Sequence, residues 1–483
     1  MMIDAKFPLI VLETHDENQA KELLTRVAIK KTRPIKYWSI SAGLSQAGFG
    51  LSLAEKGHAQ DPKTILQSIL SDQDPSLFVL CDYHPYLDNH PVHIRLLKDI
   101  ALRYEQLGHT VVLLSYAINI PPELQRLMTK FTISFPSKAE LIGIIREEIK
   151  AFQAQKPGVF IAPKIDVIHK MISSLRGLGS TAVRRLIRSA IFQDGALTES
   201  DLPEINKAKF ALLDMSGVIS FEYDTEKFSD VGGLKNLKNW VLDRKHAFLE
   251  NNHHDRPKGI MLLGVQGGGK SLAAKAVAGL WSLPLLRLDM ASLYNKYIGE
   301  TENNLRKALQ QAEMMSPCVL WIDEIEKGIN TQGDNDIASR VLGTLLTWMS
   351  EHKKSVFIVA TANDISALPP ELIRKGRLDE IFFVDLPSSA VRQQIFRIHL
   401  QKRNLNLADF DLPALGESTE GFVGAEIEQT IVSAIYTAKA QQRQLNTELL
   451  IDEIAKTYPL SVVMAEKITA LRHWAQDRTL SAG

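Results

Sequence analysis

A glycine-rich octapeptide, Gly264–Ser271, narrows the possible folds of this chain more than any other segment. It follows an apolar run, Ile260–Leu263, that predicts a buried strand, and it precedes Leu272–Ala278, which predicts a helix. Glycines at such a turn let backbone amides wrap a β-phosphate, and the start of the helix adds partial positive charge. Lys270 would reach the β- and γ-phosphates, and the Ser271 hydroxyl would coordinate Mg²⁺. The alternative is a glycine-rich turn without a ligand, but Lys270 and Ser271 would have no packing role in such a turn.

Two carboxylates, Asp323 and Glu324, end a later apolar run, Val319–Ile322. Because neighbouring residues of a strand point in different directions, we expect the two side chains to have different roles. Asp323 would hold the hydration shell of the magnesium ion, and Glu324 would act as the general base that polarises the attacking water. A solvated strand end is the alternative, but the position of the pair after the glycine-rich loop favours the catalytic interpretation.

A third polar position, Asn363, follows the apolar strand predicted at Ser355–Ala360. In a parallel sheet the carboxyl ends of the strands face the ligand, so Asn363 is placed to hydrogen-bond the γ-phosphate or the lytic water. An asparagine at a strand end is also a common turn residue. Its order after the other two motifs favours the functional interpretation.

These motifs together resemble those of the AAA family of ATPases, and the resemblance extends to segments that mean little alone. Asp230–Leu234 resembles the family's loop at the adenine base, and Gly424–Ala425 lies where the wider superfamily carries a sensor on its helical lid. The residues expected to bind the nucleotide are Asp230, Gly232, Gly264, Val265, Gln266, Gly267, Gly268, Gly269, Lys270, Ser271, Leu272, Asp323, Gly424 and Ala425.

The resemblance also implies residues that act outside their own nucleotide site. Arg374 and Arg377 resemble the family's arginine fingers, which project onto the nucleotide of a neighbouring subunit, although two surface charges at a helix end are the alternative. Tyr297, Ile298 and Gly299 match the loop that grips polypeptide in the central pore of unfolding members, although Tyr297 could instead pack on a helix face. The whole chain most resembles an AAA family named after a hypothetical chloroplast open reading frame.

The first half of the chain repeats the second in weakened form. An apolar run ending in Asp82 parallels the run ending in Asp323, and Pro121–Leu124 parallels Pro369–Leu372. The common order of such landmarks favours a duplication, and turns shared by all doubly wound domains are the alternative. At the place of the glycine-rich loop, however, Leu12–Lys21 has no glycine and three carboxylates, which would repel a triphosphate. We therefore expect a domain that does not bind ATP in this manner and serves as a structural tier or partner-binding platform.

The length of 483 residues predicts two or three domains. Lys+Arg and Asp+Glu both number 56, and this zero net charge disfavours nucleic acid as a partner. Cys81 and Cys318 both lie in apolar runs, which fits a reducing compartment. The sequence predicts neither a leader nor a membrane span, so we expect a cytoplasmic location, or the plastid stroma if the source is an alga.

The expected fold is α/β in three parts. A degenerate AAA-like domain without a phosphate-binding loop would span residues 1–205, and a P-loop ATPase subdomain with a parallel sheet would span 206–388. A helical lid with a C-terminal helix would span 389–483.

The expected function is Mg²⁺-dependent hydrolysis of ATP to ADP and phosphate between subunits of a ring, expected to be a hexamer, that remodels a protein or complex. Its partners would be copies of itself and an unidentified protein substrate or regulator. The alternative is a nucleotide-switched regulatory scaffold whose ATP state controls oligomerisation or partner binding.

Overall fold

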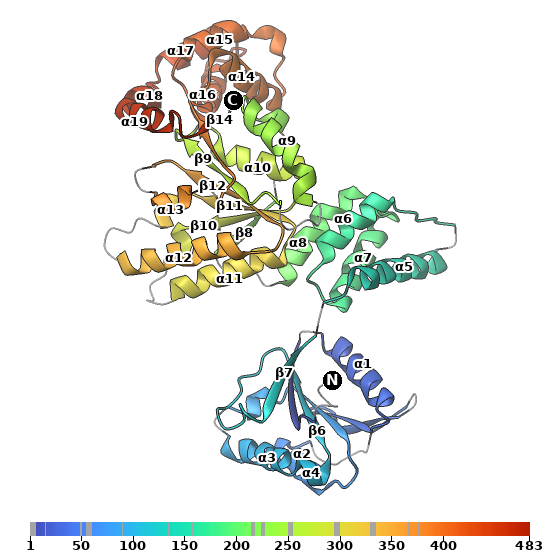
Figure 1. The fold of residues 1–483 in the computed structure, drawn as a ribbon. Coiled ribbons are helices and arrows are strands. Elements are labelled where there is room, and N and C mark those ends of the chain that lie inside the picture. Colours follow the sequence, from blue (N-terminus) through green and yellow to red (C-terminus); the bar gives the residue numbers. More distant parts are fainter. Residues whose placement is uncertain are drawn as a thin grey trace. The chain divides into compact units, whose positions relative to one another are not determined.

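The computed structural model describes residues 6–14, 16–48, 51–54, 60–88, 90–133, 135–156, 158–213, 218–223, 228–249, 255–293, 300–328, 335–365, 368–374 and 376–483. The chain divides into two compact units, which Figure 1 shows as ribbons. The first unit comprises residues 1–159 and 178–192, and the second comprises residues 160–177 and 193–483. Because the chain changes unit three times between 159 and 193, the bounds 1–205, 206–388 and 389–483 stay predictions.

The first unit is built on a seven-stranded sheet with the order β4-β3-β2-β5-β6-β1-β7. Its strands are β1 (Leu9–Glu13), β2 (Ile35–Ser39), β3 (Gly43–Gly48), β4 (Leu51–Ala54), β5 (Leu77–Cys81), β6 (Thr110–Ser115) and β7 (Met128–Thr132). The strands β2, β5, β6, β1 and β7 are parallel, with Leu9 opposite both Val111 and Met128, whereas β3 and β4 extend one edge in antiparallel fashion. The continuous apolar runs of β1, β5 and β6 fit strands that are covered on both faces.

Helices pack against both faces of this first sheet. The helices of the first unit are α1 (Glu17–Lys30), α2 (Pro62–Ser71), η1 (His84–Tyr86), α3 (Pro91–Leu102), α4 (Tyr104–Leu107), α5 (Lys138–Gln155) and α7 (Ser180–Asp194). Leu66, Ile69 and Leu97 of α2 and α3 pack in one core, and Ala20 and Leu24 of α1 pack in a second. The two cores enclose the sheet, as expected for a doubly wound domain.

The sheet of the second unit also has seven strands, with the order β14-β13-β9-β12-β11-β10-β8. They are β8 (Ile219–Glu222), β9 (Gly259–Gly264), β10 (Leu285–Asp289), β11 (Cys318–Asp323), β12 (Val356–Ala362), β13 (Glu380–Val384) and β14 (Leu480–Ser481). Numbered along the chain, the five parallel strands β13-β9-β12-β11-β10 have the spatial order 5-1-4-3-2, and so do β7-β1-β6-β5-β2 of the first unit. This shared order confirms the prediction that the first half is AAA-like.

The helices of the second unit fall into two groups. Those on and beside the sheet are α6 (Ile165–Leu175), η2 (Glu199–Asp201), α8 (Leu202–Leu212), η3 (Phe228–Asp230), α9 (Lys235–Leu249), α10 (Lys270–Trp281), η4 (Ala291–Leu293), α11 (Glu300–Met314), η5 (Ile325–Gly328), α12 (Asn335–Glu351) and α13 (Pro370–Ile373). The lid contains α14 (Ser389–Lys402), η6 (Leu407–Asp409), α15 (Leu412–Ser418), α16 (Gly424–Ala440) and α17 (Thr447–Ala455), followed by α18 (Leu460–Val463) and α19 (Ala465–Ala475). The lid has its own apolar core, which includes Phe396, Leu415 and Ile431, and Figure 1 shows these helices gathered at one end of the sheet.

The sequence-based expectations differ from the structure mainly at short elements. The C-terminal helix expected at the end of the lid is divided into α18 and α19 at Met464, whose φ of −116° and ψ of 27° interrupt the helix. Strands β3, β4, β8 and β14 were not predicted, because they are short or lie at sheet edges and lack the continuous apolar run of a central strand. Within the described stretches, no helix is both long and apolar enough to cross a bilayer.

Candidate nucleotide-binding site

The glycine-rich loop joins β9 to α10, as its sequence pattern predicts. Gly267 and Gly269 adopt φ values of +76° and +94°, a backbone conformation that is unfavourable for residues with a side chain. Gly269 is also the N-cap of α10, and no side chain caps the helix there. A Cβ on Gly267 would lie 2.9 Å from a methyl of Val423 in the lid. The loop thus combines strained turns with an uncapped helix N-terminus, the arrangement that binds phosphate.

Lys270 begins α10 and is only 7% exposed. Its Nζ donates hydrogen bonds to the carbonyl oxygens of Gly264 and Val265, both over 2.9 Å. Burial lowers the pKa of Lys270 to about 8, against the smaller opposing effect of Glu326, Glu324 and Asp323. A phosphate beside this ammonium would favour its charged form.

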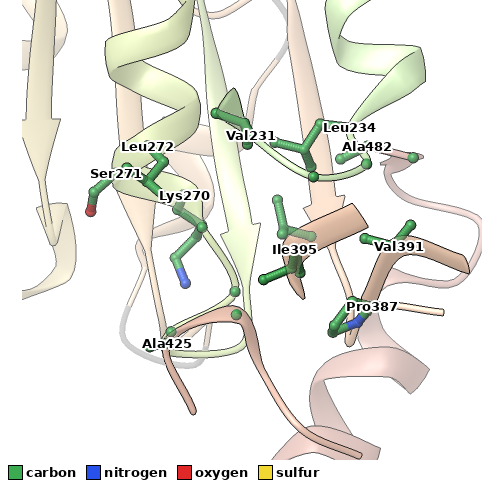
Figure 2. Close-up of a pocket in the computed structure, with 18 of the residues that line it drawn as sticks. Val231, Leu234, Lys270, Ser271, Leu272, Pro387, Val391, Ile395, Ala425 and Ala482 are labelled. Carbon is green, nitrogen blue, oxygen red and sulfur yellow. The ribbon is translucent and has the colours of Figure 1, made fainter. Parts of the chain in front are cut away.

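A cavity of about 690 Å³ lies beside the loop and is bounded by the sheet, the lid and the loop before α9. Figure 2 shows Lys270 and Ser271 toward one end of the cavity and Val231, Leu234 and Ala482 toward the other. The predicted residues that line it are Asp230, Gly232, Gln266, Gly267, Gly268, Gly269, Lys270, Ser271, Leu272, Asp323, Glu324, Asn363, Gly424 and Ala425. Gly264 and Val265 are not among the lining residues: Gly264 is packed against Val384, and Val265 is buried.

The two predicted carboxylates, Asp323 and Glu324, lie at the end of β11, and both are hydrogen-bonded to other side chains of the same chain. Asp323 accepts hydrogen bonds from Thr361 Oγ1 over 2.9 Å and from Arg287 Nη2 over 2.8 Å. Glu324, at a φ of +47°, accepts one from Asn363 Nδ2 over 2.9 Å and pairs with Lys327. The structure therefore brings the predicted metal-supporting carboxylate, general base and phosphate sensor to one wall of the cavity.

The lining fits a magnesium ion bound together with phosphates. Ser271 offers an exposed hydroxyl and Asp323 a carboxylate on the same cavity, and both are oxygen donors of the kind that Mg²⁺ prefers. Among the described residues there is no cluster of three or more His, Cys, Asp or Glu side chains that could hold a metal. Mg²⁺ does not require such a cluster, because it keeps several waters and takes further oxygens from substrate phosphates.

Two polar residues that do not line the cavity but bond residues of this wall were missed by sequence reasoning. Glu326 is 7% exposed, and its Oε1 accepts a hydrogen bond from the backbone N–H of Asn363 over 2.9 Å. Burial raises the pKa of Glu326. Arg287 on β10 bonds Asp323 and lies 4.9 Å from the centre of the Trp321 ring. An arginine inside the apolar strand Leu285–Leu288, next to the strand that carries the carboxylates, was the available signal.

The far end of the cavity is mainly apolar. The predicted base loop packs against α14, where a Cβ on Gly232 would lie 2.7 Å from Ile395 and the N–H of Gly233 donates to Gln394 Oε1 over 3.2 Å. Val391 and Ile395 of α14 also line this end. So do Ser481, Ala482 and Gly483, which no sequence motif predicted.

The predicted arginine fingers do not line the cavity of their own chain. Arg374 is exposed, and Arg377 is partly buried and donates from Nη1 to the carbonyl oxygen of Glu371. The predicted pore loop, Tyr297–Gly299, lies outside the described residues.

In the first unit, the segment that corresponds to the glycine-rich loop carries Asp16, whose carboxylate is bonded at the N-termini of α1 and α7. Asp16 accepts a hydrogen bond from the backbone N–H of Gln19 at the start of α1 over 3.1 Å, and one from Thr181 at the start of α7 over 3.2 Å. Glu13 and Glu17, the other two carboxylates of this segment, pair with Lys130 and Lys21. The negative charge that a phosphate would supply at these helix ends is thus already present as a side chain.

Comparisons with known proteins agree with this arrangement. Residues 260–386 match the ATPase family associated with various cellular activities (AAA), residues 1–133 match the N-terminal domain of SpoVK-like AAA ATPases, and residues 139–216 match their second domain. The uncharacterized AAA domain-containing protein ycf46 of Pyropia yezoensis is 34% identical over 99% of this chain and 96% of its own length, and that of Trieres chinensis is 32% identical over the same shares.

A shorter match joins this chain to a larger ATPase. The cell division cycle protein 48 homolog of Archaeoglobus fulgidus is 34% identical over 43% of this chain and 30% of its own length. The match to ycf46 proteins, by contrast, runs through both units. This chain therefore belongs to the AAA family of ATPases, in which ycf46 proteins are its relatives over nearly the full length.

Proposed function

We propose that this chain hydrolyses ATP to ADP and phosphate with Mg²⁺, at sites completed by a neighbouring copy in a ring. The observation that carries the proposal is the convergence of Lys270, Asp323, Glu324 and Asn363 on one cavity beside an uncapped helix N-terminus. A single cavity that offers a phosphate-binding lysine, metal-supporting oxygens and a carboxylate base has the parts that phosphoryl transfer to water requires.

The proposed steps follow from the positions of these side chains. The loop amides and the Lys270 ammonium, moved from its carbonyl partners, bind the β- and γ-phosphates. Ser271 and Asp323 would hold the magnesium ion, which would supply positive charge to stabilise the phosphates. Glu324 accepts a proton from water as the water oxygen bonds to the γ-phosphorus, and the bond from that phosphorus to the bridging oxygen breaks to leave ADP.

The proposal assigns Arg374 and Arg377 to the nucleotide of the adjacent subunit. Both lie outside the cavity of their own chain, and Arg374 is exposed, as a side chain acting on a neighbour must be. The ring, expected to be a hexamer, would use hydrolysis to remodel a protein, with Tyr297, Ile298 and Gly299 contacting the polypeptide.

A nucleotide-switched scaffold is the second candidate, and the ion pairs of the catalytic carboxylates favour it. Asp323 and Glu324 are held by Arg287 and Lys327 of the same chain, which is compatible with slow turnover. A Tyr297→Ala variant separates the two functions: it should abolish ATP-driven remodelling in a motor and leave partner binding intact in a scaffold.

The direct test is release of phosphate from ATP by the full chain, with and without a chelator of Mg²⁺. We expect turnover that is lost with EDTA and regained when Mg²⁺ is restored. Absence of turnover together with absence of binding to a labelled ATP analogue would refute the proposed function. Binding without turnover would favour the scaffold.

A further inference from the structure

Residues that follow α19 form part of the cavity wall, far along the chain from every nucleotide-binding motif. Strand β14 pairs in parallel with β13, with Leu480 opposite Phe382 and Ser481 opposite Phe383. The N–H of Ala482 then donates to the carbonyl oxygen of Phe383 over 3.0 Å. The segment is thus an added edge strand of the ATPase sheet, and Ser481, Ala482 and Gly483 line the cavity.

The same segment is bonded to the start of α9. The carbonyl oxygen of Ala482 accepts a hydrogen bond from the N–H of Leu237 over 3.1 Å, and that of Ser481 accepts one from Asn236 Nδ2 over 3.2 Å. The first N–H groups of a helix have no partner within it, so the Ala482 carbonyl satisfies one of them. The position of α9 relative to the sheet therefore depends on this strand.

The side chain of Ala482 packs under the base loop. It is 1% exposed and belongs to the same core cluster as Val231 and Leu234, and Figure 2 shows it beside Leu234 with Ile395 and Val391 nearby. A Cβ on Gly483 would lie 2.8 Å from the backbone nitrogen of Leu234. The base loop is consequently held between α14, which contacts Gly232, and residues 482 and 483.

Contacts of helix α19 determine the position of the segment that follows it. Ile468 packs with Val265 of the phosphate loop and Val423 of the lid. Arg472 pairs with Asp385, just after β13, over 2.9 Å. Because the helix is anchored at the phosphate end of the cavity, the strand that follows it reaches the opposite end in a defined register.

We propose that residues 481–483, which line the cavity, are a component of the nucleotide-binding site that receives the purine base and holds the base loop in its binding shape. The proposal rests on the proposed function, namely that the cavity binds ATP. A lining made of the chain at residues 481–483 together with Val391 and Ile395 suits a flat aromatic base rather than a charged group. Phosphate binding at Lys270 and Ser271 does not involve this wall.

The test compares the full chain with an Ala482→Asp variant, using ADP labelled on its ribose so that the base is native. A carboxylate at this buried position should weaken binding at least about tenfold, which corresponds to about 1.4 kcal/mol. The matched control is Leu480→Asp, which places the same charge on an exposed side chain two residues earlier, in β14 and outside the cavity lining. It should bind like the unaltered chain. Asn236→Ala, which removes only the bond to Ser481, should weaken binding a few-fold.

Inorganic triphosphate, which has no base, shows whether the loss of ADP affinity arises at the base or at the phosphates. It should displace the labelled ADP from the unaltered chain and from Ala482→Asp with the same inhibition constant. Equal ADP affinity in the unaltered chain and Ala482→Asp would overturn the inference and leave the proposed function standing. An equal loss of triphosphate affinity would overturn it as well, because the damage would then not be confined to the base. If the unaltered chain binds no nucleotide, the proposed function itself fails.

Discussion

Asn363 donates a hydrogen bond from Nδ2 to Oε1 of Glu324 over 2.9 Å. The residue expected to sense the γ-phosphate therefore holds the residue expected to activate water. The backbone N–H of Asn363 is in turn bonded to Glu326, which is buried behind it. In this geometry the Asn363 amide can bond either the base or a γ-phosphate, so the proposed sensor and base are coupled through one side chain.

We predict that Asn363→Ala lowers kcat by about 10² without weakening ATP binding, because general-base catalysis depends on the orientation of the Glu324 carboxylate. The measurement is steady-state phosphate release together with the affinity for a labelled ATP analogue. A variant with normal kcat would show that Asn363 is only a turn residue, which is the alternative that its sequence position left open.

Arg287 places a positive charge on the carboxylate that is expected to support magnesium. Its Nη2 lies 2.8 Å from Asp323 Oδ2, so bound Mg²⁺ would share that carboxylate with a guanidinium. We predict that Arg287→Gln lowers the Mg²⁺ concentration needed for half-maximal nucleotide binding by about tenfold, since a nearby cation repels the ion even in a solvated site. A Mg²⁺ titration of labelled-nucleotide binding measures the effect.

The control for this titration is Arg306→Gln, because Arg306 pairs with Glu302 on the surface of α11. It should leave the Mg²⁺ dependence unchanged. A higher Mg²⁺ requirement in Arg287→Gln would contradict the repulsion and show that Arg287 instead orients Asp323 for the ion.

The arginine-finger assignment predicts complementation between two inactive variants. Arg374→Ala should bind ATP normally but lose turnover by on the order of 10³ to 10⁵, because the finger neutralises transition-state charge. Glu324→Gln has an intact finger and no base. Mixed oligomers should regain activity, since a Glu324→Gln subunit can complete the site of an Arg374→Ala neighbour. Mixtures that stay inactive, despite co-assembly shown by size, would refute action between subunits.

The parallel α/β fold and the phosphate site could be predicted because they depend on local patterns. Gly264–Ser271 between a strand and a helix identifies the loop, and Asp323 with Glu324 after an apolar run marks the neighbouring strand end. These residues meet because parallel strands end at one edge of the sheet. The weak repeat likewise predicted an AAA-like first unit, and the parallel strands of the two units have the same spatial order.

The contributions of Arg287 and Ala482 could not be predicted in the same way. Arg287 acts through a neighbouring strand, and its role depends on the register that sets Arg287 opposite Trp321. Ala482 directly follows the two-residue edge strand β14, whose position is set by α19 and its contacts with Val265 and Asp385. Such tertiary contacts leave no periodic pattern in the sequence.

The most direct test of the central claim, that this cavity hydrolyses ATP, is phosphate release by Glu324→Gln measured beside its ATP affinity. The amide keeps the size of the side chain and its contact with Asn363 but cannot accept a proton from water. We predict unchanged binding of ATP and a loss of turnover of at least about a hundredfold. Hydrolysis at the rate of the unaltered chain would contradict the account.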